Sequence, residues 1–301
     1  MASSSSKKVI YAALTGNGLI AVTKFIAAAM TGSSAIFSEG VHSVVDTGNQ
    51  VLLLHGLRRA KRPPDKYFPF GYGKEIYFWS FVVAILLFSM GGLFSIYEGI
   101  HKLQHPEPLS MIWVAIIVLS LAILLEAGSL FGALREIKLL RGTRPFGEWL
   151  KHTRNSELVV VLGEDIGAQV GLILALVFLT MAWVTGDPVY DAMGSICIGV
   201  VLIVISGFVA WRIRSLLLGR SADPEIQGVI EEIICEAQDI ECVLNTITIQ
   251  FGPDTMLAAK VKMRADLDIE TAVRAINSLE RELKARVPNL KWCFIEPDIV
   301  D

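Results

Sequence analysis

The stretch AIFSEGVHSVVDTGNQVLLLHGL, residues 35–57, decides how the rest of the sequence is interpreted. It is long enough to cross a bilayer, which needs roughly 20 mostly apolar residues. It also carries several polar side chains, among them Glu39, His42, Asp46 and Gln50. Because it lies between apolar stretches at residues 9–31 and 76–99, we predict that it spans a membrane. Each ionisable group inside such a span then needs a partner or a function.

The remaining sequence predicts five further spans around this stretch. They are expected at residues 9–31, 76–99, 110–134, 157–184 and 189–211. The chain is 53% hydrophobic and only 19% charged, which excludes a cytosolic enzyme. The formal net charge of −3 shows no basic excess for nucleic acid. The predicted fold is therefore an all-α bundle of six transmembrane helices.

The positive charges predict the orientation of this bundle. Lys and Arg gather in the N-terminal tail and in the segments after the second, fourth and sixth spans, whereas the opposite loops contribute Lys102 only. Because such charges stay on the cytoplasmic side, we expect both termini in the cytoplasm. The N-terminal tail lacks an Arg-rich leader of the mitochondrial type, so a bacterial inner (plasma) membrane is the simplest expectation.

The last part of the chain has a different character and predicts a small cytoplasmic domain. We divide the chain into a six-span transmembrane domain, residues 1–214, and a C-terminal domain, residues 215–301. Its expected elements are a helix from Pro224 to about Ala237, strands at 243–251 and 256–263, a helix at 269–286, and a strand at 292–295. The order αββαβ predicts an α+β sandwich of ferredoxin-like or metallochaperone-like type.

Two pairs of ionisable side chains fall near the middle of predicted spans. His42 and Asp46 are four residues apart and share one helix face, and Glu164 and Asp165 occupy the fifth span. All four groups can meet near the midplane. Imidazole and carboxylate groups suit zinc, cobalt, iron or manganese, and they also exchange protons. The alternative is a hydrogen-bonded polar cluster that holds the helices together. For Lys24 and Glu126, we favour such a structural role.

Three motifs resemble the cation diffusion facilitator family of divalent-metal/proton antiporters. They are Asn17 on the first span, SEGVHSVVD at residues 38–46, and PFGYGKE at residues 69–75. The six spans and the αββαβ tail extend the resemblance to nearly the whole chain. It implies a metal efflux transporter, zinc being the first expectation, that works by alternating access as a homodimer in the lipid bilayer. It implies no prosthetic group, because the metal is the cargo.

The resemblance also implies the ligands of the transported metal. His42, Asp46 and Asp165 match the family's transport site, but Val161 stands where the family usually has His or Asp. The stretch LGED, residues 162–165, resembles the branch that includes the mitochondrial zinc transporter, so we expect Glu164 as the fourth ligand. This more oxygen-rich set also admits manganese or iron.

The C-terminal domain departs from the family pattern, because no histidine follows His152. Many family members bind regulatory metal in this domain through histidines. Five other groups could substitute, namely Cys235, Cys242, Cys293, Glu296 and Asp298. Free cysteines in a small domain are more often ordinary core or surface thiols. We therefore expect the domain to serve mainly in dimerisation.

Two rival functions stay open at this stage. The first is a metal-binding sensor or scaffold that does not transport metal. It stays possible because Val161 stands where the family usually has a metal ligand. An intramembrane aspartyl protease could use Asp46 and Asp165 as paired carboxylates. The setting Gly163-Glu164-Asp165 lacks the Gly-x-Gly-Asp pattern that such an enzyme needs, so we expect no enzyme.

Overall fold

The computed structural model describes residues 18–106, 108–287 and 289–300, which form two compact units. The first unit contains the chain up to Gly56, Trp79–Thr143 and Glu157–Ile213. The second contains Leu57–Phe78, Arg144–Ser156 and the chain from Arg214 onward. Because it also includes two segments from between the spans, the predicted domain boundary at residue 214 stays a prediction. Asn17 and the start of the first predicted span lie outside the described residues.

Helices occupy the described parts of all six predicted spans. They are Gly18–Thr31, α2 (Ser34–Ala60), a continuous segment Glu75–Gln104, α5 (Ile112–Arg141), α7 (Ser156–Thr185) and α8 (Val189–Leu218). Among the described residues, four of these are long and apolar enough to cross a membrane, namely Glu75–Gln104, α5, α7 and α8. The helix α2 is long enough but not apolar enough to count among these four, because of its polar side chains. The predicted helical membrane fold is confirmed.

The third span is not a uniform α-helix. It consists of α3 (Glu75–Leu86), a π-helical stretch η1 (Leu87–Leu93) and α4 (Phe94–Gln104). Such widened turns occur mostly as short insertions in α-helices and frequently at functional sites. The sequence did not predict this one.

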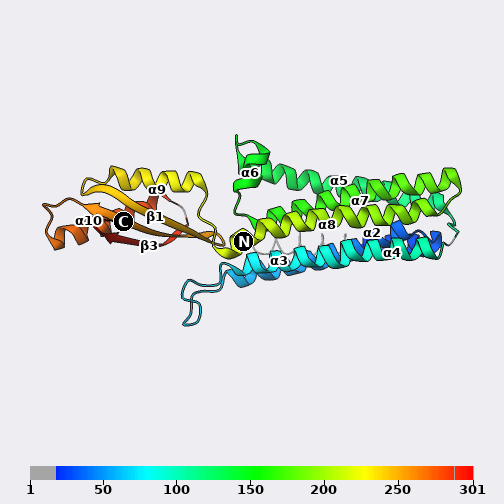
Figure 1. Ribbon diagram of the computed structural model, residues 1–301, viewed down its shortest axis with the longest axis horizontal. Coiled ribbons are helices and arrows are strands. Elements are labelled where there is room, and N and C mark those ends of the chain that lie inside the picture. Colours follow the sequence, from blue (N-terminus) through cyan, green and yellow to red (C-terminus); the bar gives the residue numbers. More distant parts are fainter. Residues whose placement is uncertain (1–17, 107, 288, 301) are drawn as a thin grey trace, which may run out of the picture. The chain divides into compact units, whose positions relative to one another are not determined.

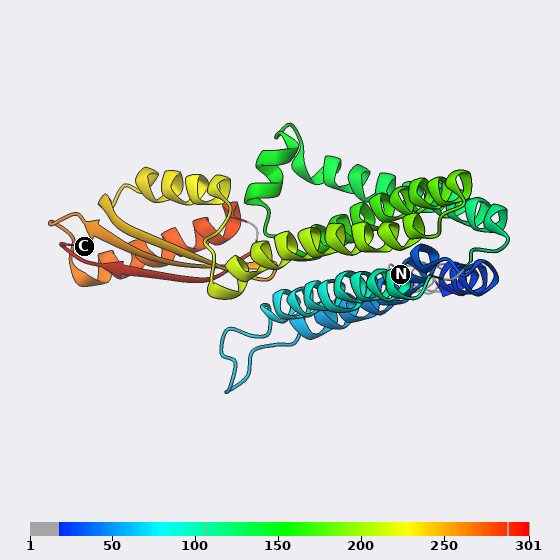
Figure 2. The same cartoon turned by 45° about the vertical axis from the view of Figure 1, so that its right-hand side comes forward.

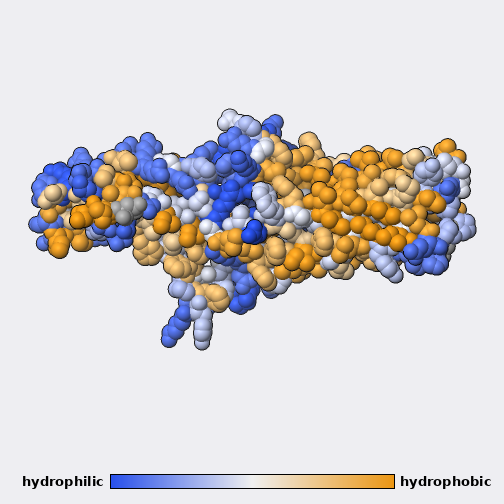
Figure 3. Space-filling view, viewed as in Figure 1, coloured by the Kyte–Doolittle hydropathy of each residue, from blue (hydrophilic) through white to orange (hydrophobic). Residues whose placement is uncertain are grey.

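The helices of the first unit lie alongside one another, as both ribbon views show (Figure 1 and Figure 2). The outward residues are largely apolar, and α5 is the most exposed of the four long spans. Leu124 is 70% exposed and Phe131 is 69% exposed. Hydrophobic residues cover much of the visible face of this unit (Figure 3). Such a surface fits a lipid environment, where apolar side chains need not be hidden.

Glycines allow the third span and α8 to pack with their backbones close together. A Cβ atom placed on Gly92 would lie 2.6 Å from Cγ1 of Ile203, and one on Gly199 would lie 2.6 Å from the carbonyl oxygen of Gly92. On α7, a Cβ on Gly163 would lie 2.8 Å from Cγ2 of Val209. Small residues serve this purpose in membrane bundles.

The start of α2 is fixed by a carboxylate from α8. The backbone N–H of Ser34 donates to Oδ2 of Asp191 at 2.7 Å, and the Ser34 hydroxyl donates to the same oxygen at 2.9 Å. The Ser33 hydroxyl donates to Oδ1. These contacts satisfy donors at the helix N-terminus that have no partner within the helix. Asp191 is fully buried, so this network ties the first turns of α2 and α8 together.

The second unit contains the predicted αββαβ fold. Its elements are α9 (Pro224–Glu236), β1 (Ile240–Phe251), β2 (Asp254–Met263), α10 (Ile269–Arg286) and β3 (Leu290–Pro297). The sheet order is β1-β2-β3, with β1 antiparallel and β3 parallel to β2. The last strand is longer than predicted because it pairs along most of β2. Alternate residues of β2, Leu257, Ala259 and Val261, form one core with both helices.

The segment before the third span packs against this sheet within the second unit. The ring of Phe70 stacks on Phe251 with 5.5 Å between centroids and lies edge-on to Trp292. The Tyr77 hydroxyl donates to the carbonyl oxygen of Gly252 at 3.1 Å. Gly73 lies so close to the Phe251 carbonyl that a Cβ atom would clash with it. Gly73 of the PFGYGKE motif therefore has a packing role.

A short helix, α6 (Phe146–His152), was not predicted. It has only seven residues, which is too short for a clear 3.6-residue periodicity. Its Trp149 is buried and packs beside the ring of Phe146, which helps to hold the helix in place.

Candidate functional site

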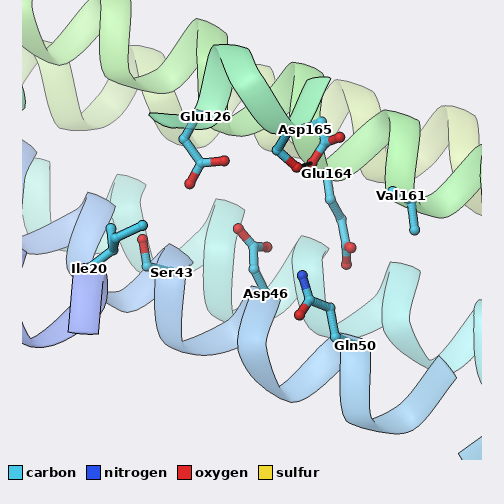
Figure 4. Close-up of a pocket in the computed structure, with 9 residues that line it drawn as sticks. Ile20, Ser43, Asp46, Gln50, Glu126, Val161, Glu164 and Asp165 are labelled. Atoms are coloured by element: carbon cyan, nitrogen blue, oxygen red, sulfur yellow. Dashed lines mark hydrogen bonds between the residues drawn. The ribbon is translucent and has the colours of Figure 1, made fainter. Parts of the chain in front are cut away.

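A polar cavity of about 60 Å³ lies inside the first unit. It is formed by the helix Gly18–Thr31 together with α2, α5 and α7 (Figure 4). Its lining residues are Ile20, Ser43, Asp46, Gln50, Glu126, Ser129, Val161, Glu164 and Asp165. A water molecule takes up about 30 Å³ of liquid, so this space holds a small ion with one or two waters.

Asp46 connects the cavity with His42. Oδ2 of Asp46 lies 3.3 Å from Nε2 of His42, which is fully buried. Neither nitrogen of His42 has a hydrogen-bond partner among the described residues, because the contact with Asp46 is not aligned for one. A Cβ atom on Gly91 would lie 3.7 Å from Nδ1, so the π-helical stretch η1 passes beside the imidazole. His42 therefore lies behind Asp46, outside the lining of the cavity.

The two acids of α7 have different polar partners. Nδ2 of Asn49 donates to Oε1 of Glu164 at 2.7 Å, and Glu164 is buried. The Ser129 hydroxyl donates to Oδ1 of Asp165 at 3.3 Å. Oδ2 of Asp165 has no partner in the part of the chain that the structure describes. Asp165 therefore keeps a free oxygen at the cavity.

A buried ion pair lies next to this cavity. Nζ of Lys24 lies 3.2 Å from Oε2 of Glu39 and donates to the Ser43 hydroxyl at 2.8 Å. The other carboxylate oxygen of Glu39 lies against Gly171, in the space that a Cβ atom would occupy. Lys24 therefore has the structural role that we expected, but its partner is Glu39.

The structure brings three of the four predicted site residues to one cavity. Asp46, Glu164 and Asp165 line it, and His42 contacts Asp46. Among the residues that the structure describes, no three His, Cys, Asp or Glu side chains are close enough together to hold a metal ion. The acids of α2 and α7 face each other across the cavity (Figure 4). The arrangement attracts a cation but does not enclose one in this conformation.

Asn49, Gln50 and Ser129 also belong to the site, although the sequence analysis named none of them as a candidate ligand. A signal was present for Asn49, because it follows His42 by seven residues and Asp46 by three. These spacings place all three side chains on one face of α2. Ser129 had no such signal, since only the approach of α5 to α7 brings it near Asp165.

The possible metal ligands of the C-terminal domain do not form a cluster. Cys293 is buried in the core of the domain, whereas Cys235 and Cys242 are exposed. Oδ2 of Asp298 lies 3.0 Å from Nζ of Lys260. Within the described residues of this domain, no metal-binding group of three such side chains exists.

The apolar helices define a multi-pass membrane protein with an acidic cavity between its spans. A family model described as the cation efflux transmembrane domain matches residues 10–218. The chain therefore belongs to the cation diffusion facilitator family.

Known relatives agree with this assignment. The mouse protein "Proton-coupled zinc antiporter SLC30A9, mitochondrial" is 31% identical over 91% of this chain and 48% of its own length. "Metal tolerance protein C4" of Arabidopsis thaliana is 30% identical over 92% of this chain and 60% of its own length. The "Manganese efflux system protein MneP" of Bacillus subtilis is 21% identical over 96% of this chain and 95% of its own length. The chain thus spans about half the length of the mouse relative.

Proposed function

We propose that this protein is a divalent-metal efflux transporter that exchanges its metal for protons. The observation that carries the proposal is the acidic cavity between α2 and α7, with Asp46, Glu164 and Asp165 in its lining. Zinc is the first candidate, because the mouse relative is a zinc antiporter by name and because His42 offers an imidazole. Manganese, iron and cobalt suit the same oxygen-rich set.

In the proposed cycle, the dication enters from the cytoplasm and binds His42, Asp46 and Asp165, with Glu164 as the fourth group. Movement of the helices relative to one another then opens the site to the other side. Protons displace the metal there, since both imidazole and carboxylate bind metal only in their deprotonated forms. This mechanism requires two conformations of the bundle, one with the cavity open to each side of the membrane.

We further propose that the protein works as a homodimer with both termini in the cytoplasm, in a bacterial inner membrane. The charge asymmetry of the loops supports this orientation, because nearly all Lys and Arg near the span ends lie on one side. The C-terminal αββαβ fold suits a dimerisation role, because its sheet has helices on one face only.

The first experiment measures metal flux in proteoliposomes loaded with a pH dye. Zinc, manganese, iron and cobalt are tested with the wild type, Asp46→Ala, Asp165→Asn and Glu164→Gln. Saturable uptake with opposite proton movement should be lost in Asp46→Ala and Asp165→Asn. The matched control is Asp187→Asn, because Asp187 is an exposed residue in the turn before α8. Retained transport in Asp46→Ala would refute the proposed site.

The result of the flux assay also separates transport from the alternative of a sensor. A sensor or scaffold binds metal without moving it, and Val161 in the cavity lining is the feature that favours this second candidate. Binding without flux of any of the four metals would establish the sensor. The effect of Glu164→Gln then decides whether Glu164 is a ligand.

A further inference from the structure

The cavity lacks a metal-binding group on α7 where the family resemblance places one. Val161 lines the cavity but has no donor atom. Glu164 lies one turn away, and one of its oxygens already accepts the amide of Asn49. The remaining wall with a charged side chain is α5, which contributes Glu126 and Ser129.

Glu126 occupies a costly position for a carboxylate. It lies in the middle of α5, between strongly exposed apolar residues such as Leu124 and Phe131. An acid in the centre of a membrane span costs on the order of 2.5–3.5 kcal/mol on insertion scales. The side chain nevertheless turns inward, toward the cavity between α5, α7 and α2 (Figure 4).

Packing does not account for this carboxylate. In the described part of the chain, no hydrogen bond or ion pair joins Glu126 to another residue. The nearby cation, Lys24, is already held by Glu39 and Ser43. Glu126 therefore does not have the structural partner that its sequence position suggested.

We propose that Glu126 is a further oxygen donor to the transported dication, so that α5 forms a third wall of the transport site beside α2 and α7. This inference rests on the proposed function. It places four carboxylates around the cavity, those of Asp46, Glu126, Glu164 and Asp165. A cavity of about 60 Å³ admits waters with the ion, so not every carboxylate must bind the metal directly.

The added carboxylate should change which metals the site prefers. Zinc binds imidazole nitrogen well and also accepts carboxylate oxygen, whereas manganese prefers oxygen ligands. With Glu126 in place of a donor at position 161, the site has one imidazole and an excess of oxygen. Removing the charge of Glu126 should therefore weaken manganese binding more than zinc binding.

The test compares Glu126→Gln with a matched control on the same helix, Glu136→Gln, since Glu136 is exposed. KM and kcat for zinc and manganese are measured in proteoliposomes. In Glu126→Gln, we expect KM for manganese to rise at least tenfold and KM for zinc to rise less. Glu126→Asp keeps the charge and should fall between this variant and the wild type. Glu136→Gln should leave both KM values unchanged.

A binding measurement without transport completes the test. Zinc and manganese are titrated into detergent-solubilised full-length protein, and thermal unfolding of each variant is followed. Weaker manganese binding in Glu126→Gln at an unchanged unfolding temperature supports the proposal. If Glu126→Gln keeps both KM values within twofold of the wild type, or only its unfolding temperature changes, Glu126 is not a donor. Failure of wild-type flux would instead refute the proposed transport function.

Discussion

The buried pair of Lys24 and Glu39 offers the sharpest test of how this bundle is held together. The two side chains are 1% and 0% exposed and lie 3.2 Å apart. Removing one member of a buried pair leaves the other charge without compensation, which costs about 3–5 kcal/mol in proteins. Lys24→Met keeps a similar side-chain length but removes the charge. We expect this variant to lose about 3 kcal/mol of unfolding free energy, a roughly 150-fold change in the equilibrium.

The double variant Lys24→Met/Glu39→Met should recover most of this loss. Replacement of a whole buried pair by apolar side chains of similar volume is often neutral. We therefore expect the double variant to be within about 1 kcal/mol of the wild type, with a coupling energy of about 2 kcal/mol or more. Unfolding in mixed micelles, followed by tryptophan fluorescence, measures the stability of the wild type, Lys24→Met, Glu39→Met and the double variant. Val22→Met is the control, because Val22 lies on the same helix and is 56% exposed.

Two results would contradict this reasoning. If Lys24→Met were as stable as Val22→Met, the ion pair would contribute nothing to the bundle. If the losses of the two single variants simply added in the double variant, Lys24 and Glu39 would not be coupled.

Two further predictions concern packing and the C-terminal domain. Gly92→Leu should destabilise the bundle by about 1–3 kcal/mol, whereas Gly128→Leu should not, because a Cβ atom at Gly128 would have nothing within 4 Å. Thermal unfolding compares the two variants. Burial raises the pKa of the Cys293 thiol to about 12. At pH 8 a maleimide should therefore label the exposed Cys235 on the order of 100-fold faster than Cys293. Because this pKa is raised above the unfolded value of about 8.5, the stability contributed by the neutral thiol is present below pH 8.5 and is lost as the pH rises toward 12. Equal labelling rates of Cys235 and Cys293 would contradict the raised pKa of Cys293.

The sequence predicted the helices well because each has its own apolar length or periodicity. Even α2 could be placed, since short connections and apolar neighbours leave it no other position. The helix α10 agrees with its predicted range because an Asp268 cap and a regular apolar stripe determine it locally. The helix α6 and the π-helical stretch η1 could not be predicted. Tertiary packing determines the first, and one extra residue in a turn leaves no periodic signal for the second.

The candidate site was only partly predictable, for a different reason. Spacing along one helix placed His42, Asp46 and Asn49 on a common face, so their association was available from the sequence. Contacts between helices were not available. That Glu126 turns toward the cavity while Lys24 pairs with Glu39 depends on the rotation of each helix about its axis. Single-sequence reasoning cannot supply that rotation when polar residues lie on more than one face.

The contact between Asp191 and the start of α2 has a consequence for how the protein is made. Asp191 follows Ser34 by 157 residues, and α2 is the least apolar of the predicted spans. At a synthesis rate of about 5–20 residues per second, the ribosome needs roughly 8 to 30 seconds to supply this carboxylate. During that time the N-terminal donors of α2 lack their final partner. The start of the second span therefore gains these contacts with Asp191 only after the last span has been synthesised.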